Sequence, residues 1–166
     1  MTPQKAFDQY HQAVYSFAYR LTRRQEVAED ITQECFLALV RAPQRFDPAR
    51  GAMRTFLFAI ARNLALKQYR DHAPEWPLED SEPSAAAAPP PDPDVSSAVE
   101  ASVAALPLLQ QEALILFEYE GATLEEIAQV VGADVGTVKS RLHRARERLR
   151  RELAPYGKAG QTHGTV

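Results

Sequence analysis

The sequence has little of what several classes of protein require. It contains a single cysteine, Cys35, so no disulfide can form within the chain. No apolar run approaches the roughly 20 residues of a membrane-spanning helix. The N-terminus is broken by charges and lacks the pattern of a signal peptide. These absences predict a cytoplasmic protein that does not insert into membranes.

Signatures of catalysis and of cofactor binding are missing as well. The sequence has no HExxH motif, no glycine-rich phosphate loop and no CxxC pair. The four histidines lie far apart in the chain, without the spacing of metal ligands. Adjacent carboxylates such as Glu125 and Glu126 project from different faces of a helix, which indicates solvated charge. We therefore expect a protein that is not an enzyme and that needs no metal or cofactor.

The chain also lacks an overall basic excess, because 19 lysines and arginines face 22 aspartates and glutamates, for a net charge of −3. The charges are unevenly distributed. Residues 1–72 hold 11 basic and 7 acidic side chains, residues 73–135 hold none and 13, and residues 136–166 hold 8 and 2. Two basic segments around an acidic one favour two surfaces for an anionic polymer, separated by a stretch that repels it. Plain solvation of helix faces is the alternative interpretation.

Residues 73–94 carry 7 of the 12 prolines, no lysine or arginine, and no apolar periodicity. This composition is typical of a flexible linker, here proline-rich and acidic. Trp76, its one apolar anchor, is interpreted as a packing residue. The linker predicts two small domains, residues 1–72 and 95–154, followed by a disordered tail over residues 155–166.

Apolar residues recur at helical spacing on both sides of the linker, and the first half has no strand pattern, so the expected fold class is all-α. Thr2 and Pro3 are typical of a helix start. In the stretch "RTFLFAIARNLALKQYRD" the inward positions are predicted to be Phe56, Leu57, Ile60 and Leu64, with Phe58, Arg62 and Tyr69 pointing away from that stripe.

The second half contains a helix-turn-helix pattern. Thr123 and Glu126 have capping-box spacing, and Gly132 permits a sharp turn before "GTVKSRLHRARERLRREL". The second helix of this motif enters the major groove of DNA. We therefore expect its N-terminal half to meet base edges and its later arginines to meet phosphates. A solvated basic helix is the alternative.

Two surfaces of the first half are not explained by a core alone. One stripe on the second helix contains Asp30, Glu34, Leu37 and Arg41, with Phe36 and Val40 adding a further apolar side. Such a helix is either deeply buried or binds a partner. On the third helix, basic and aromatic side chains interleave in a way that suits single-stranded nucleic acid.

Three stretches carry a resemblance to a known family: "AEDITQECFLALVRA", "RFDPARGAMRTFLFAIARNLALKQYR" and "LPLLQQEALILFEYEGATLEEIAQVVGADVGTVKSRLHRARERL". Together they resemble an RNA polymerase sigma factor of the extracytoplasmic-function type. The resemblance implies binding to core RNA polymerase and to promoter DNA, and the family commonly has an inhibitory anti-sigma partner. A stand-alone helix-turn-helix regulator and a helical protein-binding adaptor remain the alternative functions.

The resemblance also implies roles for individual residues. The candidates for binding core polymerase are Asp30, Gln33, Glu34, Leu37 and Arg41. The candidates for the minus-ten element are Phe46, Arg50, Arg54, Phe58, Arg62, Asn63, Lys67 and Arg70. The candidates for the minus-thirty-five element are Thr137, Lys139, Ser140, His143, Arg144, Arg146 and Arg148. The acidic linker is either a spacer or a competitor of DNA for the basic faces.

Overall fold

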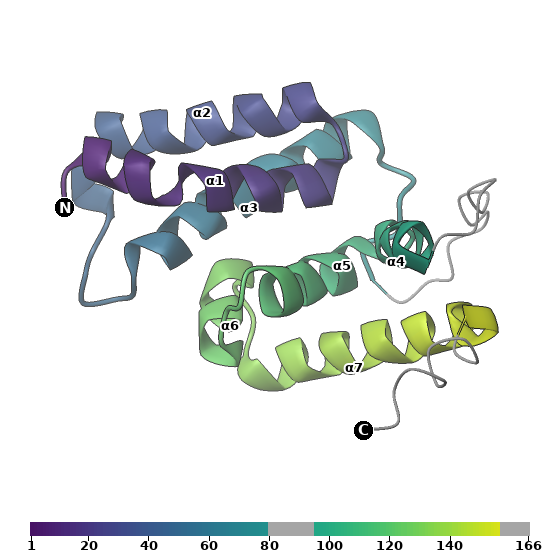
Figure 1. Ribbon diagram of the computed structural model, residues 1–166. Helices are drawn as coiled ribbons and strands as arrows, with labels where there is room; N and C mark the ends of the chain where they lie inside the picture. Colours follow the sequence, from purple (N-terminus) through teal and green to yellow (C-terminus); the bar gives the residue numbers. More distant parts are fainter. Residues whose placement is uncertain (80–94, 157–166) are drawn as a thin grey trace.

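The computed structural model describes residues 1–79 and 95–156, and all regular structure in those ranges is helical (Figure 1). The elements, in chain order, are α1 (Pro3–Thr22), α2 (Gln25–Arg41), the 3-10 turn η1 (Pro43–Arg45), α3 (Met53–His72), α4 (Val95–Ala104), α5 (Leu108–Leu114), the π-helical turn η2 (Ile115–Tyr119), α6 (Leu124–Val131) and α7 (Val135–Glu152). The all-α prediction is confirmed. Within the described ranges, no helix combines the length and the apolar character that crossing a bilayer demands.

Helices α1, α2 and α3 pack on one another and form what we call the N-terminal unit (Figure 1). The Thr2 side chain accepts a hydrogen bond from the amide of Lys5 at 3.2 Å, and Pro3 occupies the first turn of α1, as predicted. Arg23 ends α1 in the left-handed conformation, with φ 58°. The reversal that follows brings α2 back along α1, and both cover one side of α3.

Cys35 belongs to the core of this unit. It is fully buried, and its thiol donates to the carbonyl oxygen of Leu57 on α3 at 3.2 Å. Burial raises the pKa of the Cys35 thiol to about 12, so the thiolate that reacts or binds metal does not form near neutral pH. Cys35 is therefore a packing residue.

Helices α4 to α7 form the C-terminal unit, in which α5 and α6 both pack on α7. The predicted capping box is present: the amide of Glu126 donates to the Thr123 hydroxyl, and the Glu126 carboxylate accepts from the amide of Thr123, both at 3.1 Å. Gly132 ends α6 at φ 66°, and Asp134 caps α7 by accepting from the amide of Thr137 at 2.7 Å. The helix-turn-helix is thus set by local chemistry at each end of its turn.

The first part of the expected linker is attached to the C-terminal unit. The carbonyl oxygens of Pro77 and Leu78 accept from the amides of Leu108 and Leu109 at 3.0 and 2.9 Å. The Trp76 indole donates to the carbonyl oxygen of Leu106 at 3.3 Å, which agrees with its interpretation as a packing residue. We call residues 74–79 the linker strap. The rest of the expected linker, residues 80–94, and most of the expected tail, residues 157–166, lie outside the described residues.

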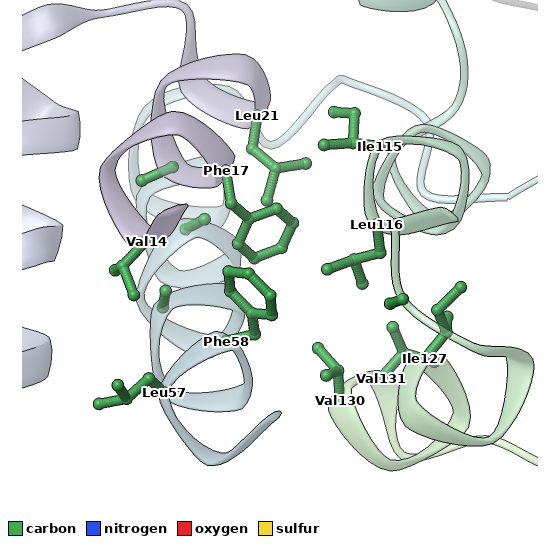
Figure 2. Close-up of a cluster of buried hydrophobic side chains, with 14 of the residues drawn as sticks. Val14, Phe17, Leu21, Leu57, Phe58, Ile115, Leu116, Ile127, Val130 and Val131 are labelled. Atoms are coloured by element: carbon green, nitrogen blue, oxygen red, sulfur yellow. The ribbon is translucent and has the colours of Figure 1, made fainter. Parts of the chain in front are cut away.

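The two units share one continuous apolar cluster. Helix α6 packs on α3, while α5 and η2 contact α1. Figure 2 shows Phe17 and Phe58 of the N-terminal unit facing Leu116 and Val130 of the C-terminal unit. The rings of Phe17 and Phe58 pack edge to face, with their centroids 5.2 Å apart. Phe58 was expected to point away from the core, and that expectation is wrong, because its side chain is only 1% exposed. The sequence pattern showed one buried side of α3, whereas the structure buries two.

The turn between α6 and α7 generates a stability prediction. Gly132→Ala should lower the free energy of unfolding by about 1 kcal/mol, because an L side chain is strained at φ 66° although no atom lies within 4 Å of the new Cβ. Gly136→Ala is the matched control inside α7, where the nearest atom is the Asp134 carboxylate at 3.5 Å. It should raise stability by roughly 0.5–1 kcal/mol. Urea unfolding followed by circular dichroism measures both, and a stabilising Gly132→Ala would contradict the assigned turn.

Candidate nucleic-acid interface

The outer face of α7 is the most basic surface of the C-terminal unit. Val138, Leu142 and Ala145 point into the core and are at most 3% exposed. The four residues expected to reach base edges all lie on the exposed side of the helix: Lys139, Ser140, His143 and Arg144. Helix α7 lies on the side of the C-terminal unit away from α1 to α3, so its outer face is open to a large ligand (Figure 1). The structure therefore brings these candidates together on one accessible face.

The other minus-thirty-five candidates sit at the two ends of this face. Thr137 is in the first turn of α7, half-buried, where its amide holds the Asp134 cap and helps to lower the pKa of that carboxyl. Arg146 pairs with Glu118 at 3.1 Å and lies over the Phe117 ring, and Arg148 pairs with Glu152 at 3.2 Å. The pair of Arg146 is exposed and therefore weak, and the pair of Arg148 lies within one turn of α7 with a carboxylate that is 33% exposed. A phosphate can displace the carboxylates, so both arginines are oriented but remain available.

The polymerase-binding candidates form an exposed stripe along α2. All five are exposed to solvent, and Leu37 is 40% exposed although it is apolar. Val40 beside them is 57% exposed, whereas Phe36 is buried and packs edge to face on Phe7. Helix α2 lies on the side of the N-terminal unit remote from α5 to α7 (Figure 1). Deep burial therefore does not explain this stripe.

The minus-ten candidates fall into two groups. Asn63, Lys67 and Arg70 are exposed along one flank of α3. Phe46 and Arg50 also belong to this first group, and they line a cavity of about 450 Å³ between the loop after α2 and the start of α3. The ring of Phe46 meets that of Phe56 edge to face at 5.4 Å. An aromatic wall beside basic side chains is a surface on which an unstacked base can lie.

The second group turns toward the C-terminal unit and differs from the sequence expectation. Arg62 makes a two-point ion pair with Glu112 of α5, with N–O distances of 2.8 and 3.0 Å. Arg54 donates to the carbonyl oxygen of Glu120 at 3.1 Å and to the Glu126 carboxylate at 3.4 Å. Phe58 is buried between the units. In this conformation the second half of the chain covers Phe58 and most of Arg62, and it partly covers Arg54, whose side chain is 30% exposed.

Glu112 is the residue that sequence reasoning missed. Its side chain is 1% exposed and that of Arg62 is 15% exposed. Burial raises the pKa of the Glu112 carboxyl, and the hydrogen bonds and charge of Arg62 oppose that rise. The available signal was a lone carboxylate within the apolar run "LLQQEALILF". Glu126 forms the predicted capping box and, besides facing solvent, meets Arg54, a contact that the sequence did not indicate. The amide of Thr123 is the main cause of its lowered pKa.

Gln129 of α6 lines the same cavity as Phe46 and Arg50. Its side-chain amide donates to the carbonyl oxygen of Arg50 at 2.9 Å. Its amide oxygen also lies 2.9 Å from the place where a Cβ on Gly51 would stand. Glycine at position 51 thus allows α6 to approach the loop closely. The C-terminal unit therefore makes polar contacts with three minus-ten candidates, Arg50, Arg54 and Arg62, and packs on a fourth, Phe58 (Figure 2).

Comparison with known proteins identifies relatives of both units. Residues 6–75 match the family described as Sigma-70 region 2, and residues 96–149 match Sigma-70, region 4. The ECF RNA polymerase sigma factor SigE of Mycolicibacterium smegmatis is 35% identical over 159 residues, which cover 89% of this chain and 60% of SigE. The chain thus spans less than two thirds of SigE. SigW of Bacillus subtilis is 30% identical over 88% of this chain and 86% of its own length.

Solved structures show the same arrangement of helices. The sigma factor RpoE from Bartonella quintana, in complex with the anti-sigma factor NepR, superposes with a TM-score of 0.72 at 26% identity, covering 91% of this chain and 96% of that chain. CnrH in complex with the cytosolic domain of CnrY gives 0.70 at 23% identity, with coverage of 92% and 88%. The second likeness concerns the fold alone.

The buried ion pair generates a second prediction. Glu112→Ala should lower the free energy of unfolding by roughly 3 kcal/mol or more, because the Arg62 charge loses its partner in a largely buried site. Glu118→Ala breaks the exposed pair with Arg146 and should cost less than about 1 kcal/mol.

A double variant separates packing from pairing. Arg62→Met with Glu112→Leu removes both charges while filling similar space, and it should recover most of the loss. Thermal and urea unfolding of the three variants decides the point. Equal losses for Glu112→Ala and Glu118→Ala would mean that the pair between the units is no stronger than a surface contact.

Proposed function

This chain belongs to the extracytoplasmic-function sigma factors of RNA polymerase, and we propose that three of its surfaces divide the work of starting transcription. Members of the family bind core RNA polymerase, direct it to promoters and are not themselves enzymes. In our assignment α2 contacts core polymerase, α3 and the preceding loop read the minus-ten element, and α7 reads the minus-thirty-five element. The observation that carries the proposal is the exposed basic face of α7, placed by a capped helix-turn-helix.

The assignment of α7 rests on the order of its side chains. Lys139, Ser140, His143 and Arg144 occupy the first half of the outer face, and the N-terminal half of a recognition helix is the part that reaches base edges. Arg and Lys donate to guanine in the major groove. The arginines in the second half lie where the helix leaves the groove, and we assign them to backbone phosphates.

The assignment of α2 rests on an exposed, mixed stripe without a partner inside the described chain. Asp30, Gln33 and Glu34 supply polar and negative groups, and Leu37 supplies apolar area that would otherwise remain in water. Such a combination suits a protein partner better than DNA, because carboxylates repel phosphates. A stand-alone helix-turn-helix regulator would have no use for this surface, and an adaptor would have no use for the basic face of α7.

The assignment of the minus-ten surface includes a change of conformation. Asn63, Lys67 and Arg70 are accessible as the structure stands, but Arg54, Phe58 and Arg62 are covered by the C-terminal unit. We propose that the two units separate on the promoter, which frees Arg62 and Arg54 for DNA. RpoE of B. quintana is held by the anti-sigma factor NepR, and we propose that a protein of that kind also controls this chain.

Run-off transcription with reconstituted core polymerase on genomic fragments tests the proposed function directly. It asks whether initiation depends on both proteins and maps the promoters at the same time. Transcripts that start at defined sites only when both proteins are present support the proposal. DNA binding without any effect on polymerase would favour the stand-alone regulator.

The α2 surface generates a third prediction. Asp30→Lys with Glu34→Lys should weaken binding to core polymerase at least tenfold, because two exposed carboxylates are replaced by charges of the opposite sign. Asp8→Lys with Asp71→Lys, exposed on α1 and α3 and outside this stripe, is the matched control and should have a smaller effect. Pull-down and fluorescence titration measure affinity, while circular dichroism checks helicity. Loss of helicity in the first variant would make the two carboxylates structural.

The α7 surface generates a fourth prediction. Arg144→Ala should cost roughly 1–3 kcal/mol on the preferred upstream element and relax discrimination there. Arg150, 71% exposed and paired with Glu147 at 2.6 Å, lies nearly two turns further along α7. Arg150→Ala should weaken all sequences alike and reduce the salt slope by about one unit. Binding to matched and scrambled duplexes over a salt series distinguishes the two variants. If Arg144→Ala lost the same affinity on both duplexes, the placement of α7 in the major groove would be wrong.

A further inference from the structure

The linker strap delivers an acidic side chain to the recognition helix. Backbone hydrogen bonds fix Pro77 and Leu78 to the start of α5. The next residue, Glu79, places its carboxylate 3.8 Å from the guanidinium of Arg141 on α7. The position of Glu79 is therefore set by the two residues before it, which are held by main-chain bonds that do not depend on the ion pair.

Glu79 and Arg141 meet at a cavity on the flank of the DNA-reading face. The cavity measures about 240 Å³, and α7 lines it with Thr137, Ser140, Arg141 and Arg144. Three of these four are candidates for the minus-thirty-five element, whereas Arg141 was not among the sequence candidates. Two hydroxyls and two guanidinium groups around a small hollow form a set of donors typical of a phosphate site.

Arg141 has donor capacity that the described protein does not use. Its side chain is only 15% exposed, and its Nη1 is buried without a hydrogen-bond partner among the described residues. An unpaired buried donor costs free energy, and a charged acceptor relieves that cost best. Glu79 approaches the other terminal nitrogen, Nη2, at 3.8 Å with its own side chain 73% exposed, so it attracts the guanidinium only weakly and leaves Nη1 unpaired among the described residues.

We propose that this cavity binds a backbone phosphate of the upstream promoter element and that Glu79 is a built-in carboxylate competitor for it. The proposal rests on the function proposed above, since it concerns the regulation of the same α7 face. In the free protein the carboxylate partly satisfies Arg141 and places a negative charge where DNA would bring its own. The phosphate displaces it, and any movement of the linker strap away from α7 raises the affinity for DNA.

The test compares two glutamates of the same strap in the full-length protein. Glu79→Gln should tighten binding to a duplex that carries the upstream element about two- to fivefold at low salt. Glu75→Gln removes the same charge from an exposed position that makes no ion pair within the described residues, and it should leave affinity unchanged. Fluorescence anisotropy on the matched duplex and a scrambled one measures both.

A third variant assigns the effect to Arg141. Arg141→Gln should weaken DNA binding, and in that background Glu79→Gln should bring no gain. If Glu79→Gln and Glu75→Gln raised the affinity for DNA equally, the effect would come from net charge alone and the proposal would be wrong. It would also be wrong if Glu79→Gln still raised the affinity in the Arg141→Gln background. The comparison of the two glutamates decides the matter even if Arg141→Gln unfolds the protein.

The same experiment keeps this proposal distinct from the proposed function. If the wild-type protein binds matched and scrambled duplexes equally well, both alone and with core polymerase, the assignment of α7 to the minus-thirty-five element fails. If it prefers the matched duplex while the two glutamine variants behave alike, only the role of Glu79 fails.

Discussion

Helix α3 buries Leu57 on one side and Phe58 on the other, and both side chains are at most 1% exposed. Figure 2 shows the two pointing in opposite directions. Adjacent residues of a helix lie about 100° apart, so a helix with both buried needs cover over a wide arc. Helices α1 and α2 cover the side of Leu57, while Phe17 of α1 and the C-terminal unit together cover the side of Phe58 (Figure 2). The closed arrangement of the two units follows from this requirement.

The polar contacts between the units make that arrangement specific. Apolar surfaces tolerate sliding, whereas the two-point pair of Arg62 and Glu112 has one geometry. A buried ion pair adds little net stability, because desolvation offsets most of the attraction. It therefore suits an interface that has one defined closed state and that opens in the function proposed above. The contact of Gln129 with the loop at Arg50 adds a second fixed point.

The uneven distribution of charge along the sequence has a structural meaning beyond repulsion of an anionic polymer. Several carboxylates of the acidic middle segment serve as partners for arginines of the two basic segments. Glu112 and Glu126 meet Arg62 and Arg54 of α3, and Glu118 and Glu79 meet Arg146 and Arg141 of α7. All four arginines belong to, or border, surfaces assigned to DNA. The acidic segment thus supplies internal counter-charges for those surfaces, and in the proposed function DNA phosphates replace them.

Local sequence determined the helices themselves, their caps at Thr2 and Thr123 and the turn at Gly132. Each depends on interactions within a few residues, where propensity, capping and periodicity act directly. The exposed candidates on α7 were predictable for the same reason, since an amphipathic pattern reports which side of a helix avoids water. The pattern of α2, apolar on several sides, left deep burial and partner binding open. Only the tertiary structure decided which way Phe58, Arg54 and Arg62 face. A helix that is apolar on two sides has no unique outward direction, and the partner of Arg62 lies 50 residues away in the chain, beyond the reach of any local pattern.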